Sequence, residues 1–74
     1  MTLKVAVIGA GSMGRNHARV YSEMPDVELV GVVDIDEKVA RTVARRYGGI
    51  AYTDCVQMLE EQTPDAVTVA VPTV

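Results

Sequence analysis

A glycine-rich turn directly after a short apolar run constrains this chain more than any other feature. Residues 3–8 are rich in β-branched side chains, which is typical of a parallel strand buried on both faces. Gly9, Gly11 and Gly14 follow in the spacing Gly-x-Gly-x-x-Gly. Gly9 permits a tight turn, Gly11 lets the backbone approach a pyrophosphate, and Gly14 lets the next helix lie close to the strand. The turn therefore predicts a nucleotide-binding loop.

The helix after this turn is expected to begin at Ser12 or Met13. Its free backbone N–H groups and the positive end of its dipole would then face an anion at the turn. Such a site needs no lysine. The glycine spacing alone is weak evidence, because it also occurs in ordinary loops and turns, and a βαβ unit that binds nothing is the alternative.

The context of the turn supports nucleotide binding. A second β-branched run, residues 27–33, ends at Asp34, which lies 20 positions after Gly14. Dinucleotide-binding folds place at this point the acid that hydrogen-bonds the adenosine ribose. The alternative role of Asp34, capping the next helix, competes with Asp36, which is itself a good N-cap.

Strands and helices alternate along the rest of the chain. The expected strands are residues 3–8, 27–33, 50–52 and 66–71. Gly48 and Gly49 are expected to end the second helix, and Thr53 or Asp54 to cap the third. Residues 63–65, Thr-Pro-Asp, should break that third helix.

This order predicts an α/β fold with four parallel strands in the order 3-2-1-4 and three helices, a doubly wound sheet. The Gly9 loop and a turn at Pro72 and Thr73 would face each other across the ligand crevice. Because the fourth strand would be an exposed apolar edge, we expect the chain to self-associate through it as a homo-oligomer.

The composition of the chain excludes several other classes of function. The 74 residues form at most one small domain, and a net charge of −3 argues against a nucleic-acid partner. The lone Cys55 and lone His17 exclude an internal disulfide and a zinc cage, so we expect a reducing, cytoplasmic setting. No apolar run approaches the ~20 residues that span a membrane, and residues 1–4 run directly into the first expected strand. We therefore expect a soluble protein without a cleavable targeting segment.

The core must be built from Val, Ala, Ile, Leu and Met, because aromatic residues make up only 4% of the chain. Met13, Met24 and Met58 are expected to fill it. His17 shares a helical stripe with Met13 and Val20, so a packing or hydrogen-bonding role is favoured over that of a general base.

The opening Val-Ala-Val-Ile-Gly-Ala-Gly-Ser-Met-Gly-Arg-Asn-His-Ala-Arg resembles that of the Gfo/Idh/MocA oxidoreductases, relatives of glucose-fructose oxidoreductase and inositol dehydrogenase. The resemblance continues through Val-Gly-Val-Val-Asp at 30–34, Ala-Tyr-Thr-Asp at 51–54 and Pro-Asp-Ala-Val-Thr-Val-Ala-Val-Pro-Thr at 64–73. It therefore covers the whole chain and implies a partial Rossmann fold.

The resemblance also implies a function. Residues 1–74 would be the N-terminal NAD(P)-binding part of an oxidoreductase that transfers hydride between nicotinamide and a sugar, cyclitol or nucleotide-sugar alcohol. The residues that carry over as cofactor-binding are Gly9, Gly11, Ser12, Met13, Gly14, Asp34, Ile35, Pro72 and Thr73. The family's catalytic lysine, in a Glu-Lys-Pro motif, and its substrate domain have no counterpart here, so this chain is expected to bind cofactor without catalysis.

NAD is favoured over NADP, because the carboxylate of Asp34 would accept from both ribose hydroxyls and repel a 2′-phosphate. Ile35 strengthens this preference, since a basic residue there could have held the phosphate, although Arg15 or Lys38 could partly substitute. Two other functions stay open: a stand-alone NAD-binding regulatory module without catalysis, and a purely structural fragment.

Overall fold

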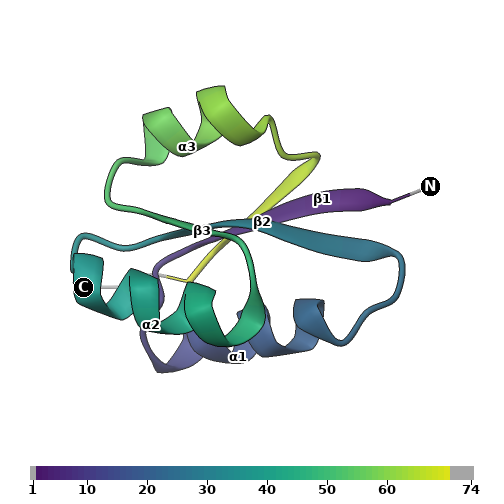
Figure 1. The fold of residues 1–74 in the computed structure, drawn as a ribbon, viewed down its shortest axis with the longest axis horizontal. Coiled ribbons are helices and arrows are strands. Elements are labelled where there is room, and N and C mark those ends of the chain that lie inside the picture. Colours follow the sequence, from purple (N-terminus) through teal and green to yellow (C-terminus); the bar gives the residue numbers. More distant parts are fainter. Residues whose placement is uncertain (1, 71–74) are drawn as a thin grey trace.

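The computed structural model describes residues 2–70, which form a four-stranded parallel sheet with helices on both faces (Figure 1). In chain order the elements are β1 (Leu3–Ile8), α1 (Ser12–Ser22), β2 (Val27–Val33), α2 (Glu37–Tyr47), β3 (Ile50–Tyr52), α3 (Cys55–Gln62) and β4 (Ala66–Val69). The strand order is β3-β2-β1-β4, and each pairing is parallel. The predicted doubly wound fold, strand order and helix positions are confirmed.

The fourth strand ends earlier than predicted. The pairing of β1 with β4 runs from Val5 opposite Ala66 to Ile8 opposite Val69. Ala70 is no longer part of the strand, although its N–H still donates to the Ile8 carbonyl at 2.8 Å. β4 lies at one edge of the sheet, and Val69 in this strand is 65% exposed.

Local signals set the ends of the second and third helices. Asp36 caps α2 and Asp54 caps α3, each through a carboxylate oxygen that accepts from two amides of the first turn. The structure thus selects Asp54 over Thr53. Gly48 ends α2 at φ +109°, and Thr63 ends α3 in the left-handed region.

The sheet separates two cores. α1 and α2 cover one face, and α3 covers the other (Figure 1). The buried cluster on the α1 and α2 face consists of Val5, Val7, Ala10, Ala18, Leu29, Val32, Ala40, Val43 and Ala44. The cluster under α3 consists of Ala6, Val33, Tyr52 and Met58. Met58 is fully buried, as predicted, and packs over Gly31, where an added Cβ would lie 2.7 Å from the Met58 Cγ.

The prediction that Met13 and Met24 fill the core is wrong. The two residues are 64% and 43% exposed, and Val20 on the same stripe is 41% exposed. α1 turns its other stripe to the sheet, where Gly14 and Ala18 are buried. Small residues on this stripe let the helix backbone approach the strands more closely than methionines would permit.

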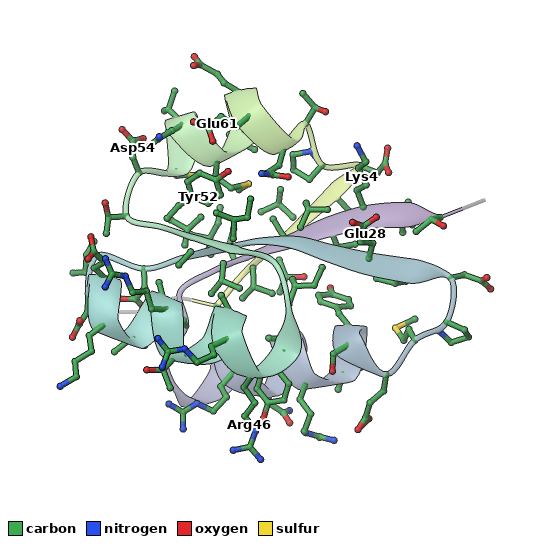
Figure 2. All side chains as sticks on the ribbon, in the orientation of Figure 1. Lys4, Glu28, Arg46, Tyr52, Asp54 and Glu61 are labelled. Carbon is green, nitrogen blue, oxygen red and sulfur yellow. The ribbon has the colours of Figure 1, made fainter. Side chains whose placement is uncertain are left out.

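The outer face of α2 is polar, as the sequence indicates. Figure 2 shows Arg46 on the outer side of the helix layer, directed away from the sheet. Its guanidinium carbon lies 5.5 Å from the centroid of the Tyr47 ring. Arg41 pairs with Glu37 at 2.7 Å, one turn earlier on α2. These contacts account for Arg41 and Arg46 without a ligand.

Candidate functional site

The glycine turn is fixed by close backbone contacts at the carboxyl end of β1. Gly9 has φ +92°, a conformation that other residues rarely adopt, and its N–H donates to the Val33 carbonyl at 2.7 Å. A Cβ on Gly14 would lie 1.5 Å from the Gly9 carbonyl oxygen. Both glycines are therefore required by the fold itself.

Gly11 differs from its two neighbours. Its backbone, at φ −67° and ψ −164°, suits any residue, and an added Cβ would meet no heavy atom of the described chain within 4 Å. Neither conformation nor internal packing requires a glycine there. Open space beside an extended backbone is what the approach of a diphosphate needs.

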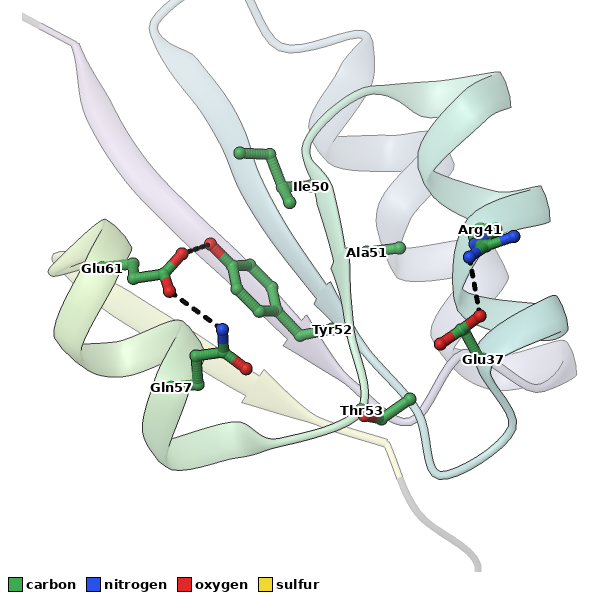
Figure 3. Close-up of a pocket in the computed structure, with 8 residues that line it drawn as sticks. All are labelled: Glu37, Arg41, Ile50, Ala51, Tyr52, Thr53, Gln57 and Glu61. Carbon is green, nitrogen blue, oxygen red and sulfur yellow. Dashed lines mark hydrogen bonds and ion pairs between the residues drawn. The ribbon is translucent and has the colours of Figure 1, made fainter.

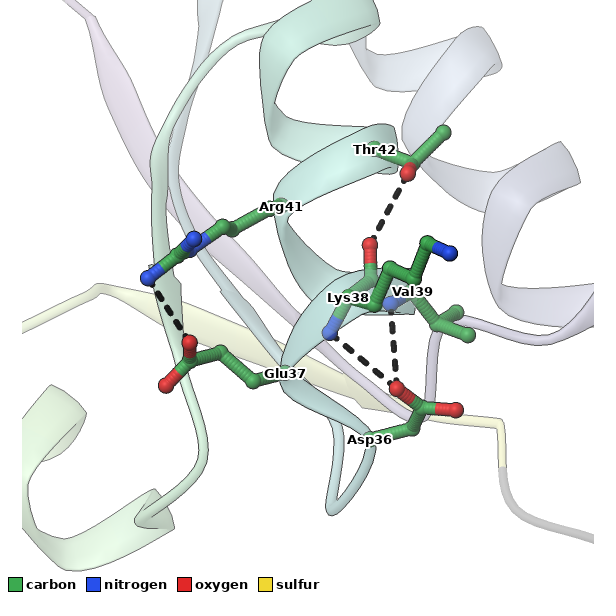
Figure 4. A network of polar contacts seen from close by, with 6 residues as sticks. All are labelled: Asp36, Glu37, Lys38, Val39, Arg41 and Thr42. Atoms are coloured by element: carbon green, nitrogen blue, oxygen red, sulfur yellow. Dashed lines mark hydrogen bonds and ion pairs between the residues drawn. The ribbon is translucent and has the colours of Figure 1, made fainter.

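The start of α1 also differs from the starts of the other described helices. In α2, the Asp36 carboxylate accepts from the amides of Lys38 and Val39 at 3.1 and 3.4 Å (Figure 4). α1 has Gly11 at the N-cap position, so no side chain is present to accept from its first amides. Its first turn carries no acidic residue either. The first N–H groups and the positive dipole end of α1 thus have no side-chain cap, which is the arrangement that suits an anion.

Asp34 lies at the end of β2, beside the turn. Its Oδ2 accepts from the Ala10 N–H at 2.8 Å, and its Oδ1 accepts from the Asp36 N–H at 2.8 Å. The structure thus gives the N-cap of α2 to Asp36 and directs Asp34 toward the glycine turn. Ile35 follows and is 95% exposed, although it is a large apolar residue.

The structure brings most of the predicted site residues to one end of the sheet. The glycine turn, Met13 at the start of α1, and Asp34 with Ile35 all follow the carboxyl ends of β1 and β2. Ser12 opens α1. Pro72 and Thr73 lie outside the described residues. Sequence reasoning missed Ala10, because a contact made by a backbone amide leaves no mark on residue type.

A second polar region lies at the outer edge of β3, between α2 and α3 (Figure 3). It is an open hollow of about 320 Å³. Its charged groups already have partners: the Tyr52 hydroxyl donates to Glu61 at 2.9 Å, Gln57 donates to the other Glu61 oxygen at 3.0 Å, and Arg41 pairs with Glu37. The hollow is therefore a weaker candidate than the glycine turn.

Within residues 2–70, no three His, Cys, Asp or Glu side chains gather as a metal site would need. Over the same stretch, no helix combines the length and the apolar character that crossing a membrane requires.

Comparison with known proteins places this geometry in a family. Residues 3–74 match the family model described as oxidoreductase family, NAD-binding Rossmann fold. The solved structure of GenD2 from gentamicin A biosynthesis, in complex with NAD, is 41% identical, with a TM-score of 0.92 over 99% of this chain and 21% of that one.

Two named dehydrogenases are also similar. Inositol 2-dehydrogenase/D-chiro-inositol 3-dehydrogenase of Lacticaseibacillus casei is 38% identical over 93% of this chain and 21% of its own length. The structure of UDP-N-acetylglucosamine 3-dehydrogenase GnnA from Acidithiobacillus ferrooxidans is 33% identical, with a TM-score of 0.85 over 99% of this chain and 23% of that one. A structure described as an NADP complex, at 24% identity, shares the fold.

The chain spans about a fifth of the length of these relatives, and nearly all of this chain is covered by the match. The strand order, the glycine turn and the family match over residues 3–74 agree with one another. This chain belongs to the Gfo/Idh/MocA oxidoreductase family, with the NAD-binding Rossmann fold of that family.

Proposed function

We propose that this chain is the dinucleotide-binding part of an NAD-dependent oxidoreductase that acts on an alcohol of a sugar, cyclitol or nucleotide sugar by hydride transfer. The observation that carries the proposal is the start of α1, where Gly11 leaves both the first amides and the space before them open. A diphosphate has the charge and the acceptor oxygens to bind there.

The proposed site extends from the turn to the end of β2. The backbone of residues 9–14 binds the pyrophosphate, the Asp34 carboxylate accepts from the adenosine ribose hydroxyls, and the exposed Ile35 packs on the adenosine end. Pro72 and Thr73 are proposed for the nicotinamide side, by family resemblance alone. The substrate class rests on the relatives, whose names include inositol and UDP-N-acetylglucosamine dehydrogenases.

NAD is the proposed cofactor because Asp34 stands where a 2′-phosphate would bring a second negative charge. Loss of the Asp34 carboxylate would remove the acceptor for the ribose hydroxyls of NAD. Loss of its negative charge would also remove the repulsion of the 2′-phosphate of NADP. The relatives that support this preference include GenD2, solved with NAD at 41% identity. No observation favours the regulatory-module alternative.

The test is the affinity of the chain and of its Asp34→Ala variant for NAD and for NADP, measured by calorimetric titration. We expect the chain to bind NAD at least about tenfold more tightly than NADP. The Asp34→Ala variant should bind NAD more weakly, and its ratio of NAD affinity to NADP affinity should be smaller. An unchanged NAD affinity in Asp34→Ala would remove the proposed ribose site.

A further inference from the structure

The Asp34 carboxylate makes two hydrogen bonds within the protein, and together we call them the Asp34 bridge. Oδ2 accepts from the Ala10 N–H, 24 positions away in the sequence, and Oδ1 accepts from the Asp36 N–H. Both bonds are 2.8 Å long, which is short enough for strong bonds from amides to a charged acceptor. The bridge therefore joins the glycine turn to the loop that precedes α2.

The bridge holds the turn at its middle residue. Ala10 is fully buried and stands between Gly9, at φ +92°, and Gly11, the N-cap residue of α1. The Gly9 N–H donates to the Val33 carbonyl, so β2 and the residue after it hold two consecutive amides of the turn. Without the carboxylate, the Ala10 amide would lose its acceptor in a part-buried position, which disfavours this turn conformation.

We propose that Asp34 is a positioning residue for the glycine turn, in addition to its proposed contact with ribose. The bridge fixes the orientation of the turn and of the first amides of α1 before any ligand binds. Ordering this segment in advance lowers the entropic cost of binding a diphosphate. The binding consequence rests on the proposed function, whereas the bridge itself is a property of the ligand-free chain.

The two roles of Asp34 predict opposite results for inorganic pyrophosphate, a diphosphate without ribose. If Asp34 only binds ribose, Asp34→Ala removes a nearby negative charge, and pyrophosphate should bind equally well or more tightly. If Asp34 positions the turn, the same substitution should weaken pyrophosphate binding despite the removed repulsion. We expect at least about threefold weaker binding in Asp34→Ala.

The direct test is amide hydrogen exchange of the ligand-free, ¹⁵N-labelled chain. We expect the Ala10 amide to exchange at least about tenfold faster in Asp34→Ala than in the unsubstituted chain, relative to the amides of β2. Normalising to β2 removes any change in global stability. The control is Asp36→Ala, which removes the cap of α2 but keeps the backbone N–H that Asp34 binds, and it should leave Ala10 protected.

Asp34→Asn provides a second variant if Asp34→Ala fails to fold. Its side chain offers one acceptor oxygen in place of two, so it can keep only one of the two amides protected. Unchanged exchange of both Ala10 and Asp36 in these variants would overturn the bridge, even if NAD binding is as proposed. If the chain fails to bind NAD but Ala10 loses protection, the proposed function fails and the bridge stands.

Discussion

The starts of α1 and α2 meet the same physical requirement in opposite ways. α2 begins with Asp36, whose carboxylate accepts from two first-turn amides, and Glu37 adds a charge favourable to the dipole (Figure 4). α1 begins with Gly11 and has no acid in its first turn. The first amides of α2 have a side-chain acceptor, whereas α1 has no side-chain cap. This difference is the reason for proposing the start of α1 as the ligand site.

The hollow beside β3 supports the same conclusion. Among the polar side chains drawn in Figure 3, Tyr52 of β3 and Gln57 of α3 both donate to Glu61 of α3. Arg41 and Glu37 pair with each other within α2. We therefore propose that the ligand binds at the glycine turn, where amides and space are left unused, and not in the concave hollow beside β3.

The largest expected effect comes from Gly14→Ala, which adds a methyl group 1.5 Å from the Gly9 carbonyl oxygen. Because the clash is with backbone, the turn or α1 must move. We expect the free energy of unfolding to fall by more than about 3 kcal/mol, measured by denaturant titration followed by circular dichroism. A loss below about 1 kcal/mol would mean that α1 does not lie this close to the turn.

Gly11→Asp should make α1 begin as α2 does. The backbone at position 11 is extended and the space is open, so the new carboxylate can cap the helix. We expect the free energy of unfolding to rise by about 0.5 kcal/mol, while NAD affinity falls at least about tenfold because the amides are occupied and the charge repels a diphosphate. Denaturant titration and calorimetry measure the two quantities.

Gly11→Asn is the matched control for that substitution, because it has the same shape and capping ability without the charge. We expect an intermediate loss of NAD affinity. Full NAD affinity in both variants would show that the start of α1 is not a phosphate site.

Asp36→Ala should have the smallest effect, and on stability alone. It removes two hydrogen bonds from the start of α2, so we expect the free energy of unfolding to fall by about 1 kcal/mol and NAD affinity to change by less than about twofold. Asp54→Ala makes the same change at the start of α3 and should behave alike. A tenfold loss of NAD affinity in Asp36→Ala would erase the distinction between the two helix starts.

Much of the fold was predictable because local and global signals agree. Apolar runs of strand length alternate with capped helical segments, and this alternation leaves few topologies other than a parallel doubly wound sheet. Asp36 and Gly48 bound α2 in the sequence as they do in the structure. These are properties of single residues, and reading them needs no knowledge of distant contacts.

The predictions failed for features that depend on contacts between residues far apart in the sequence. α1 carries two apolar stripes, and periodicity could not tell that Gly14 and Ala18 would pack on the sheet while Met13 and Met24 stayed exposed. The Asp34 bridge was missed for a related reason: its partner is the amide of Ala10, a group that every residue except proline has. The candidate site was therefore predictable in its residue types and not in its internal contacts.

Titration of the ¹⁵N-labelled chain with NAD, followed by amide chemical shifts, tests the central claim most directly. We predict the largest shift changes at residues 9–14 and at Asp34 and Ile35, with little change along β3. Changes centred on Ile50–Tyr52 and the neighbouring α3, with an unaffected glycine turn, would contradict the claim and place the ligand in the hollow beside β3.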